Sequence, residues 1–304
     1  MVRDKAVMFD KSAFEAIKTS AHGSWFKLYM DTITPVLLRE IIADLAKNEP
    51  GKASTKLVSG LAQKFRGSGG VVNMDWQVLC IGSLEGQPVE MRGAAVVPEP
   101  PIHMVNGEPT YVMGPTSDNE AIMRWADGEF SKGETAYAEY LRASVKAFEP
   151  TRFYGRVNHA AVTKRLDTLS ADVDTFIAEN TALVIDWVID QLRGYSINGS
   201  IPLHRRFVAR RWNEAGRPHL KDLAPYAHHV ARTLLMLVIG RNHVPSNPTN
   251  RRQDAEYLLY LPFCHVFVSD DGVHKALAPM LLGPYQEFLT REQFLARVAQ
   301  AKKP

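Results

Sequence analysis

The sequence of 304 residues contains only two cysteines, Cys80 and Cys264, which excludes a disulfide scaffold and a cysteine-rich zinc module. Long apolar runs are also missing. The longest, around 234–239, has about eight residues with its edges, whereas a bilayer span needs roughly 20. Neither sign of charge dominates, since 36 Lys and Arg face 33 Asp and Glu, a net charge of +3. A nucleic-acid partner therefore has to be inferred from local patches, because the overall charge neither requires nor excludes one.

The N-terminal segment lacks the apolar core of a signal peptide, because Asp4, Asp10 and several basic residues interrupt it. Hydrophobic residues make up 45% and charged residues 23% of the chain, which is typical of a soluble globular protein. We therefore expect a cytoplasmic protein with no membrane partner. Its length suits two domains, or one domain with a large insertion.

The two ends of the chain share one pattern. Residues 1–46 read as strand, helix, strand and helix, and residues 226–304 resume this alternation. These two zones predict one discontinuous domain of the α/β class, with a doubly wound, mainly parallel sheet.

The middle of the chain, 47–225, has a different texture and predicts an inserted accessory region of mixed α+β structure. Residues 50–70 are rich in Gly, Ser and Lys, as in a linker. Strand-like runs separated by Gly and Pro predict a small antiparallel meander at about 71–113. From about 118 to 221 the pattern is helical.

Acidic residues carry the main chemical signal. Asp10 and Asp271 each follow a short apolar strand, and the carboxyl ends of parallel strands converge on a ligand crevice. Glu40 lies beside the apolar stripe of a predicted helix, and Asp254 opens another predicted helix. Carboxylates brought together repel one another unless a hard dication neutralises them. The four acids therefore predict a site for Mg²⁺ or Mn²⁺, which could activate water and stabilise a phosphodiester transition state.

Three segments, VMFDKS, TPVLLRE and TNRRQDAEYLLYLPFCHVFVSDD, together resemble a PIN-like nuclease domain. The first motif of that family is an apolar strand ending in Asp. The second is a Ser or Thr followed by a helical acid, and the third is an Asp at a helix start followed by a strand ending in Thr/Ser-x-Asp. The matching positions are Asp10, Thr34, Glu40, Asp254, Ser269 and Asp271.

The resemblance implies a doubly wound α/β fold whose acidic cluster binds Mg²⁺ or Mn²⁺ and cleaves RNA. It covers roughly 1–46 and 248–285, and the long interval between these segments departs from a compact family domain and implies an insertion. The implied catalytic and metal-binding residues are Asp10, Glu40, Asp254 and Asp271. The supporting residues are Thr34, Ser269 and Asp270.

Positive charge is concentrated at 201–221. Arg206 and Arg210 lie four residues apart and would share a helical face, which suits a phosphate backbone. The alternative is that these charges pair with the acids of 167–190. The predicted nucleic-acid-binding residues are Arg205, Arg206, Arg210, Arg211, Arg251 and Arg252.

Each acid also has a purely structural interpretation, as a helix cap, a turn residue or an ion-pair partner. Asp10 would cap a helix, Glu40 would pair with Arg39 or a residue one turn away, and Asp254 would neutralise a neighbouring Arg. The histidines at 219, 228, 229 and 243 do not have the spacing of a zinc site.

The function predicted from these residues is a metal-dependent endoribonuclease, for example a toxin-like or defence effector. Its insertion would contact a regulatory protein or a second copy of the chain. Two alternatives stay open: a non-catalytic nucleic-acid-binding or regulatory protein on a PIN-like scaffold, and a DNA-directed structure-specific nuclease. Relief of carboxylate repulsion predicts that Asp10→Asn or Asp271→Asn folds as well as the unmodified chain, or better.

Overall fold

The centre of the computed structural model is a five-stranded sheet in the order β3-β2-β1-β6-β7, in which every pairing is parallel. Its strands are β1 (Ala6–Phe9), β2 (Met30–Ile33), β3 (Val71–Val72), β6 (Val266–Val268) and β7 (Glu287–Leu289). The structure describes residues 5–18, 25–47, 54–66, 70–97, 102–105, 108–111, 117–146, 155–157, 165–192, 201–244 and 248–301. The predicted α/β class with a parallel sheet is confirmed, and strands from both ends of the chain form that sheet.

β1 occupies the middle of the sheet. Val7 lies opposite Asp31 of β2 on one side and Val266 of β6 on the other. All four residues of β1 are buried, because neighbouring strands and helices enclose the strand from every side. This enclosure explains why the strand is an uninterrupted apolar run that stops at Asp10.

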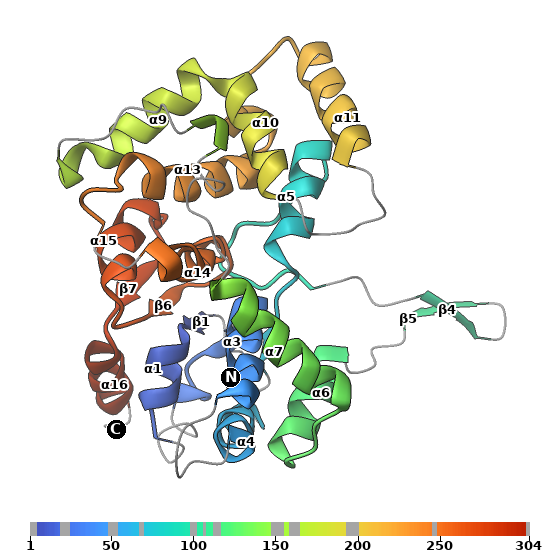
Figure 1. Cartoon of the computed structure of the whole chain (residues 1–304), viewed down its shortest axis with the longest axis vertical. Helices are drawn as coiled ribbons and strands as arrows, with labels where there is room; N and C mark the ends of the chain where they lie inside the picture. The colour runs from blue at the N-terminus through green and yellow to red at the C-terminus, as the bar shows by residue number, and fades with distance from the viewer. Residues whose placement is uncertain are drawn as a thin grey trace.

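Helices surround the sheet and extend beyond it (Figure 1). Near the sheet lie α1 (Lys11–Ala16), α3 (Pro35–Ala43), α14 (Pro248–Leu258), α15 (Gly272–Leu281) and α16 (Arg291–Gln300). A second group stands at the top of Figure 1 and consists of α9 (Leu169–Glu179), α10 (Thr181–Gln191), α11 (Ile201–Glu214) and α13 (Pro225–Ile239). The remaining helices are α4 (Ser54–Phe65), α5 (Trp76–Glu85), α6 (Ser117–Ala126), α7 (Lys132–Lys146) and α12 (Leu220–Leu223), with short 3-10 turns at Asp44–Ala46, Gly155–Val157, Leu166–Thr168 and Leu261–Phe263.

The predicted antiparallel meander at about 71–113 is wrong in most of its extent. β3 joins the main sheet, and Trp76–Glu85 forms helix α5. The Asp75 side chain caps this helix by accepting from Gln77 N at 2.9 Å, and Gly86 ends it with a φ of 97°. Since α5 is buried on nearly all sides, its apolar run has no helical period and resembles a strand. Only β4 (Ile102–Val105) and β5 (Glu108–Tyr111) form an antiparallel pair.

The predicted linker at 50–70 contains a helix as well. In α4, Val58, Leu61, Ala62 and Phe65 are buried on one face, although Gly and Ser between them suggested a linker. Because β3 also belongs to the central sheet, 47–225 is not a separate insertion along its whole length. Its later part, from α6 to α12, is helical as predicted.

None of the helices in the described ranges combines the length and the apolar character that a membrane span requires.

Candidate functional site

Two of the four predicted acids stand at the carboxyl ends of neighbouring strands. Asp10 directly follows β1, and Asp271 follows β6 after two intervening residues. From β1 the chain builds one half of the sheet through β2 and β3, whereas β6 and β7 form the other half. The direction of strand order therefore changes between β1 and β6, and open parallel sheets bind ligands at such a switch point.

A cavity of about 260 Å³ opens at this position. Asp10, Glu40, Asp254 and Asp271 all line it, so the fold brings together the four acids that the sequence singled out. Glu15 adds a further carboxylate, which the sequence analysis missed because Glu15 belongs to no motif. The other lining residues are Lys11, Ser12, Tyr257 and His274.

The carboxylate of Asp10 is buried and held by protein donors. Its Oδ1 accepts from Ala13 N at 2.7 Å and from Ser12 Oγ at 3.0 Å, so Asp10 is also the N-cap of α1. Its Oδ2 accepts from the Ser269 hydroxyl and lies 3.3 Å from His274 Nδ1. Burial alone would raise the pKa of Asp10, but the hydrogen bond and charge of His274, followed by the bonds of Ser269 and Ala13, lower it. Asp10 is therefore a stabilised carboxylate.

His274 is a second residue of the pocket that the sequence did not single out. Its Nε2 lies 2.7 Å from the backbone oxygen of Asp254, and its Nδ1 lies 2.7 Å from Ser269 Oγ. Ser269 donates its own proton to Asp10, so both ring nitrogens of His274 face acceptors. Burial would lower the pKa of His274, but the hydrogen bonds and the charge of Asp10 raise it. His274 is thus the buried cationic partner of Asp10, and a single histidine on a helix gives no sequence signal of that role.

Glu40 reaches the pocket from α3 and meets Tyr257 of α14. The Tyr257 hydroxyl donates to Glu40 Oε2 and accepts from Lys11 N at 3.2 Å. Burial raises the pKa of Glu40, and the bond from Tyr257 and the charge of Lys11 offset only part of this rise. The alternative pairing of Glu40 with Arg39 does not occur, since the Arg39 guanidinium binds Asp75 at 3.1 Å and Glu256 at 2.6 Å.

Asp254 does not open a helix, as the sequence suggested, but lies within α14, which begins at Pro248. Proline is favoured at the first helical position, and the polar residues after it continue the helix to Asp254. None of the described residues donates a hydrogen bond to the Asp254 carboxylate. Burial, followed by the charges of Asp271, Glu40 and Asp10, raises its pKa to about 7, although His274 acts in the opposite direction.

The three supporting residues have distinct positions. Thr34 is buried and caps α3, since its Oγ1 accepts from Leu37 N at 3.2 Å. Ser269 binds Asp10 and also accepts from Asp271 N at 3.0 Å, so it ties the two strand ends together. Asp270 lies outside the pocket lining, and its carboxylate approaches Arg291 Nε at 3.4 Å at the start of α16. The structure therefore separates Asp270 from the candidate site.

The donor chemistry of this pocket fits a hard divalent cation. Its ligands would be carboxylate oxygens. Burial is the largest cause of the raised pKa of Asp254, and a cation would relieve the repulsion by Asp271, Glu40 and Asp10 that adds to it. Across the described residues, no three His, Cys, Asp or Glu side chains already lie at metal-ligand spacing. Asp10 and Glu40 have protein partners, and one oxygen of Asp271 caps α15 through Val273 N at 2.7 Å. An ion would therefore require the side chains of the pocket to move closer together.

Two of the arginines predicted to bind nucleic acid are structural. Arg205 forms ion pairs with two acids of α10: its Nε lies 2.7 Å from Asp186 Oδ1, and its Nη2 lies 2.5 Å from Asp190 Oδ1. Arg211 donates to the backbone oxygens of Leu84 at 2.8 Å and Leu223 at 2.9 Å. These guanidiniums hold helices together. Arg205 follows the alternative of pairing with the acids of 167–190, and phosphate binding by Arg205 and Arg211 stays a prediction.

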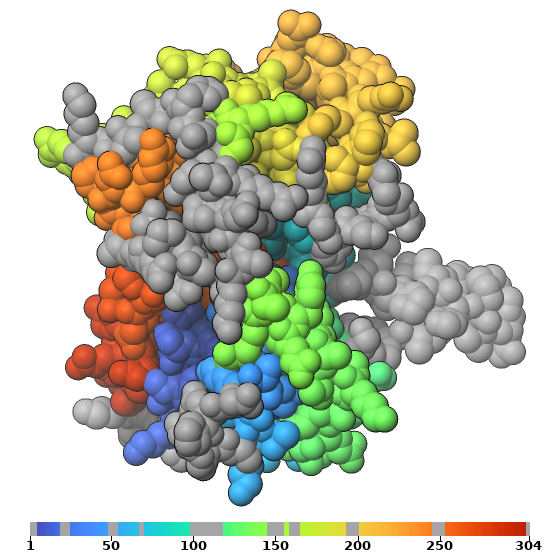
Figure 2. Space-filling view, in the orientation of Figure 1, coloured from blue at the N-terminus to red at the C-terminus, as the bar shows by residue number. Residues whose placement is uncertain are grey.

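The exposed arginines of α11 lie away from the acidic pocket. Arg206 is exposed, and exposed Arg210 stacks over Phe207 with 5.4 Å from its guanidinium carbon to the ring centroid. α11 stands at the top of the molecule, whereas α1 is near the lower end (Figures 1 and 2). Arg251 and Arg252 belong to α14 in the turn before Asp254, and their side chains lie outside the described part of the structure.

Comparisons of the chain with protein-family models, with curated proteins and with solved structures found no match.

Proposed function

We propose that this protein is a metal-dependent nuclease with a PIN-like active site, and that RNA is its substrate. The observation that carries the proposal is that Asp10, Glu40, Asp254 and Asp271, chosen by motif from distant parts of the chain, line one pocket at the switch point of a parallel sheet. These four acids match the motifs in sequence order, and they also line the pocket at the switch point of the sheet.

Mg²⁺ or Mn²⁺ is the implied cofactor, and Asp254 is its best-placed ligand because none of the described residues donates a hydrogen bond to its carboxylate. Glu40, Asp271 and Asp10, which already accept protein hydrogen bonds, would complete the set. A bound divalent cation would supply an activated water and offset the charge of a phosphodiester transition state.

The remaining residues of the pocket position these acids. His274 and Ser269 fix the Asp10 carboxylate, and Tyr257 fixes Glu40. Without a cation, several carboxylates in one small cavity repel a phosphodiester anion. Activity is therefore expected to depend strictly on the metal. RNA as the substrate follows from the PIN-like resemblance, and Arg206 and Arg210 are the exposed arginines of α11 that could contact its backbone.

The test is cleavage of single-stranded RNA and DNA oligonucleotides with Mg²⁺, with Mn²⁺ and with a chelator. We expect metal-dependent cleavage of RNA that Asp271→Asn reduces by at least about a hundredfold. The matched control is Asp270→Asn, which changes the neighbouring acid that lies outside the pocket and is expected to leave the rate unchanged. If Asp271→Asn cleaves as fast as Asp270→Asn, the assignment of this pocket is wrong. Preferential cleavage of DNA would instead support the DNA-directed alternative.

The partners of Asp10 favour a second candidate, a non-catalytic nucleic-acid-binding protein on the same scaffold. The Asp10 carboxylate already has His274 as a counter-ion, so its burial needs no metal. In that case, adding Mg²⁺ to protein that a chelator has freed of metal would not raise its melting temperature. Under the nuclease proposal Mg²⁺ raises it, and Asp254→Asn removes most of the increase.

A further inference from the structure

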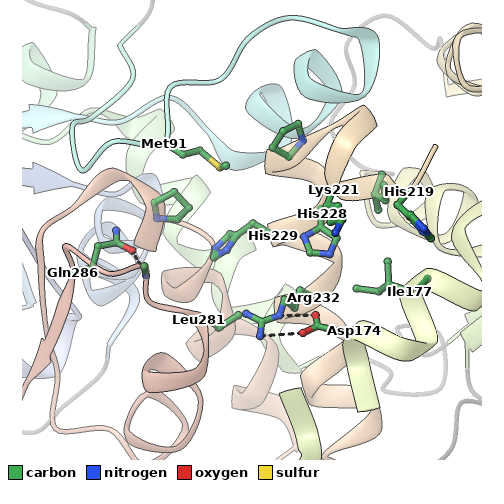
Figure 3. A pocket seen from close by; sticks show the side chains of 15 residues that line it. Met91, Asp174, Ile177, His219, Lys221, His228, His229, Arg232, Leu281 and Gln286 are labelled. Atoms are coloured by element: carbon green, nitrogen blue, oxygen red, sulfur yellow. Dashed lines mark hydrogen bonds and ion pairs between the residues drawn. The ribbon is translucent and has the colours of Figure 1, made fainter. Parts of the chain in front are cut away.

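A second and larger cavity, of about 640 Å³, lies at the opposite edge of the sheet. Pro262 precedes β6, and Gly283 and Gln286 precede β7, so these lining residues stand at the amino ends of the strands. α9, α12 and α13 supply the facing walls (Figure 3). The two cavities have no lining residue in common. The volume falls in the range of about 300–1,000 Å³ typical of small-molecule sites.

One wall of this cavity carries the ammonium group of Lys221 together with two histidines. Lys221 and His228 lie close together in Figure 3, with His219 beyond them, and burial lowers the pKa of His228. Lys221 is exposed, and no residue in the described ranges forms an ion pair with its ammonium group. Its charge is therefore available to a ligand.

The other full charges on the lining cancel one another. Arg232 Nε donates to Asp174 Oδ1 at 2.8 Å, and its Nη1 and Nη2 donate to Met280 O at 2.8 Å and Ser170 Oγ at 2.5 Å. Asp174 and Arg232 thus form a neutral pair whose groups are already bonded. Among the residues that line the cavity, the remaining full charge is the positive charge of Lys221, and Asp222, the next residue in the chain, also acts on His228.

His229 supplies a hydrogen-bond acceptor in the middle of the cavity. Its Nε2 lies 2.9 Å from the backbone oxygen of Leu258, which can only accept, so Nε2 carries the ring proton. Burial lowers the pKa of His229 to about 4, and the charges of Arg232 and His228 add to this effect while the bond to Leu258 opposes it. The ring is therefore neutral at pH 7, and its Nδ1 has no donor among the described residues.

The rest of the lining is largely apolar. Met91 lies to one side of His229 in Figure 3. Pro262, Leu220, Ile177 and Leu281 also line the cavity. Apolar side chains around a concave space provide a favourable environment for an apolar ligand body.

We propose that this cavity binds a small organic anion, with its carboxylate or phosphate group at Lys221 and His228 and its apolar body against Met91 and Leu281. A hydroxyl or N–H group in the middle of such a ligand would donate to His229 Nδ1. This site is separate from the acidic pocket, and its occupation does not depend on nuclease activity.

Calorimetric titration of the full chain with four probes tests this proposal. Phenyl phosphate and phenylacetate carry an anion and an apolar ring, benzyl alcohol lacks the anion, and inorganic phosphate lacks the ring. We expect one or both aromatic anions to bind with a dissociation constant of about a millimolar or below, and the two partial probes to bind at least about tenfold more weakly. Tighter binding of phenyl phosphate than of phenylacetate indicates a phosphate site, and the reverse order of affinity indicates a carboxylate site.

Three exposed positions supply the variants. Lys221→Gln should weaken binding about tenfold, because it removes a charged hydrogen-bond donor. Ala178→Trp should abolish binding, because Ala178 lines the cavity and the indole would fill it. Lys132→Gln removes an exposed lysine of α7 outside the lining and is the matched control. Circular dichroism checks that each variant is folded. The proposal is overturned if neither aromatic anion binds, or if either binds Lys221→Gln and Ala178→Trp as tightly as the control.

Discussion

Replacing Asp254 by Asn is expected to stabilise the metal-free protein at alkaline pH. Burial and the charges of Asp271, Glu40 and Asp10 raise the pKa of Asp254 from 3.8 to about 7. An acid whose pKa is higher in the folded than in the unfolded chain costs no stability below the unfolded pKa and has its full cost above the folded pKa. The cost therefore begins near about pH 4 and is complete above about pH 7.

The size of this effect follows from the shift in pKa. About three pKa units correspond to about 4 kcal/mol, and this value is an upper limit because the acids of the pocket titrate together. Solvent reaches the half-buried carboxyl and screens its neighbours, so we expect about half of that value, about 2 kcal/mol. For a chain of this size, about 2 kcal/mol raises the melting temperature by about 4 °C.

Thermal unfolding in the presence of a chelator, at about pH 8 and at about pH 5, measures the difference in stability between Asp254→Asn and the unmodified chain. At the lower pH the folded carboxyl is protonated, so less than half of the gain should remain. Asp270→Asn is the control, because this acid lies outside the pocket lining and pairs only at the surface with Arg291. Its effect should stay below about 0.5 kcal/mol. The reasoning fails if Asp254→Asn gives no stabilisation at the higher pH, or if its gain is equally large at both.

Asp10→Asn should destabilise the protein, in contrast to Asp254→Asn. It should lower the free energy of unfolding, measured in urea at neutral pH, by about 3 kcal/mol, because it leaves His274 buried without its counter-ion. Because the pKa of Asp10 is lowered in the folded chain, the stability that Asp10 contributes should be present above about pH 4 and be lost in acid. An Asp10→Asn variant as stable as the unmodified chain, or more stable, would contradict the pairing with His274. Arg211→Ala should cost about 2 kcal/mol in the same assay, because several backbone oxygens lose their donor, whereas Arg206→Ala should change stability by less than about 0.5 kcal/mol. In a filter-binding assay Arg206→Ala should weaken RNA binding and reduce its salt dependence, and unchanged binding would exclude α11 as a contact surface.

The sequence by itself determined the ends of the buried strands and the acids that follow them. β1 and β6 are enclosed by neighbours, so each is an apolar run that stops where the chain leaves the sheet. Asp10 marks that boundary directly, and Asp271 follows it after two further residues. Local rules also located the start of α3, since Thr34 and Pro35 form a helix start without help from distant residues. These features were predictable because their causes lie within a few residues of one another.

Tertiary structure decided how these elements and side chains are paired. α5 looked like a strand because burial on nearly all sides removes the helical period, and only packing shows that it is a helix. The stability expected for Asp10→Asn changed sign because His274, more than 250 residues away along the chain, lies beside the carboxylate. The sequence left open whether Arg205 pairs with the acids of 167–190, and the position of α10 shows that it pairs with Asp186 and Asp190. Charges and hydrogen bonds act over a few ångströms in space, so a pattern along the chain cannot specify which distant partner neutralises a given group.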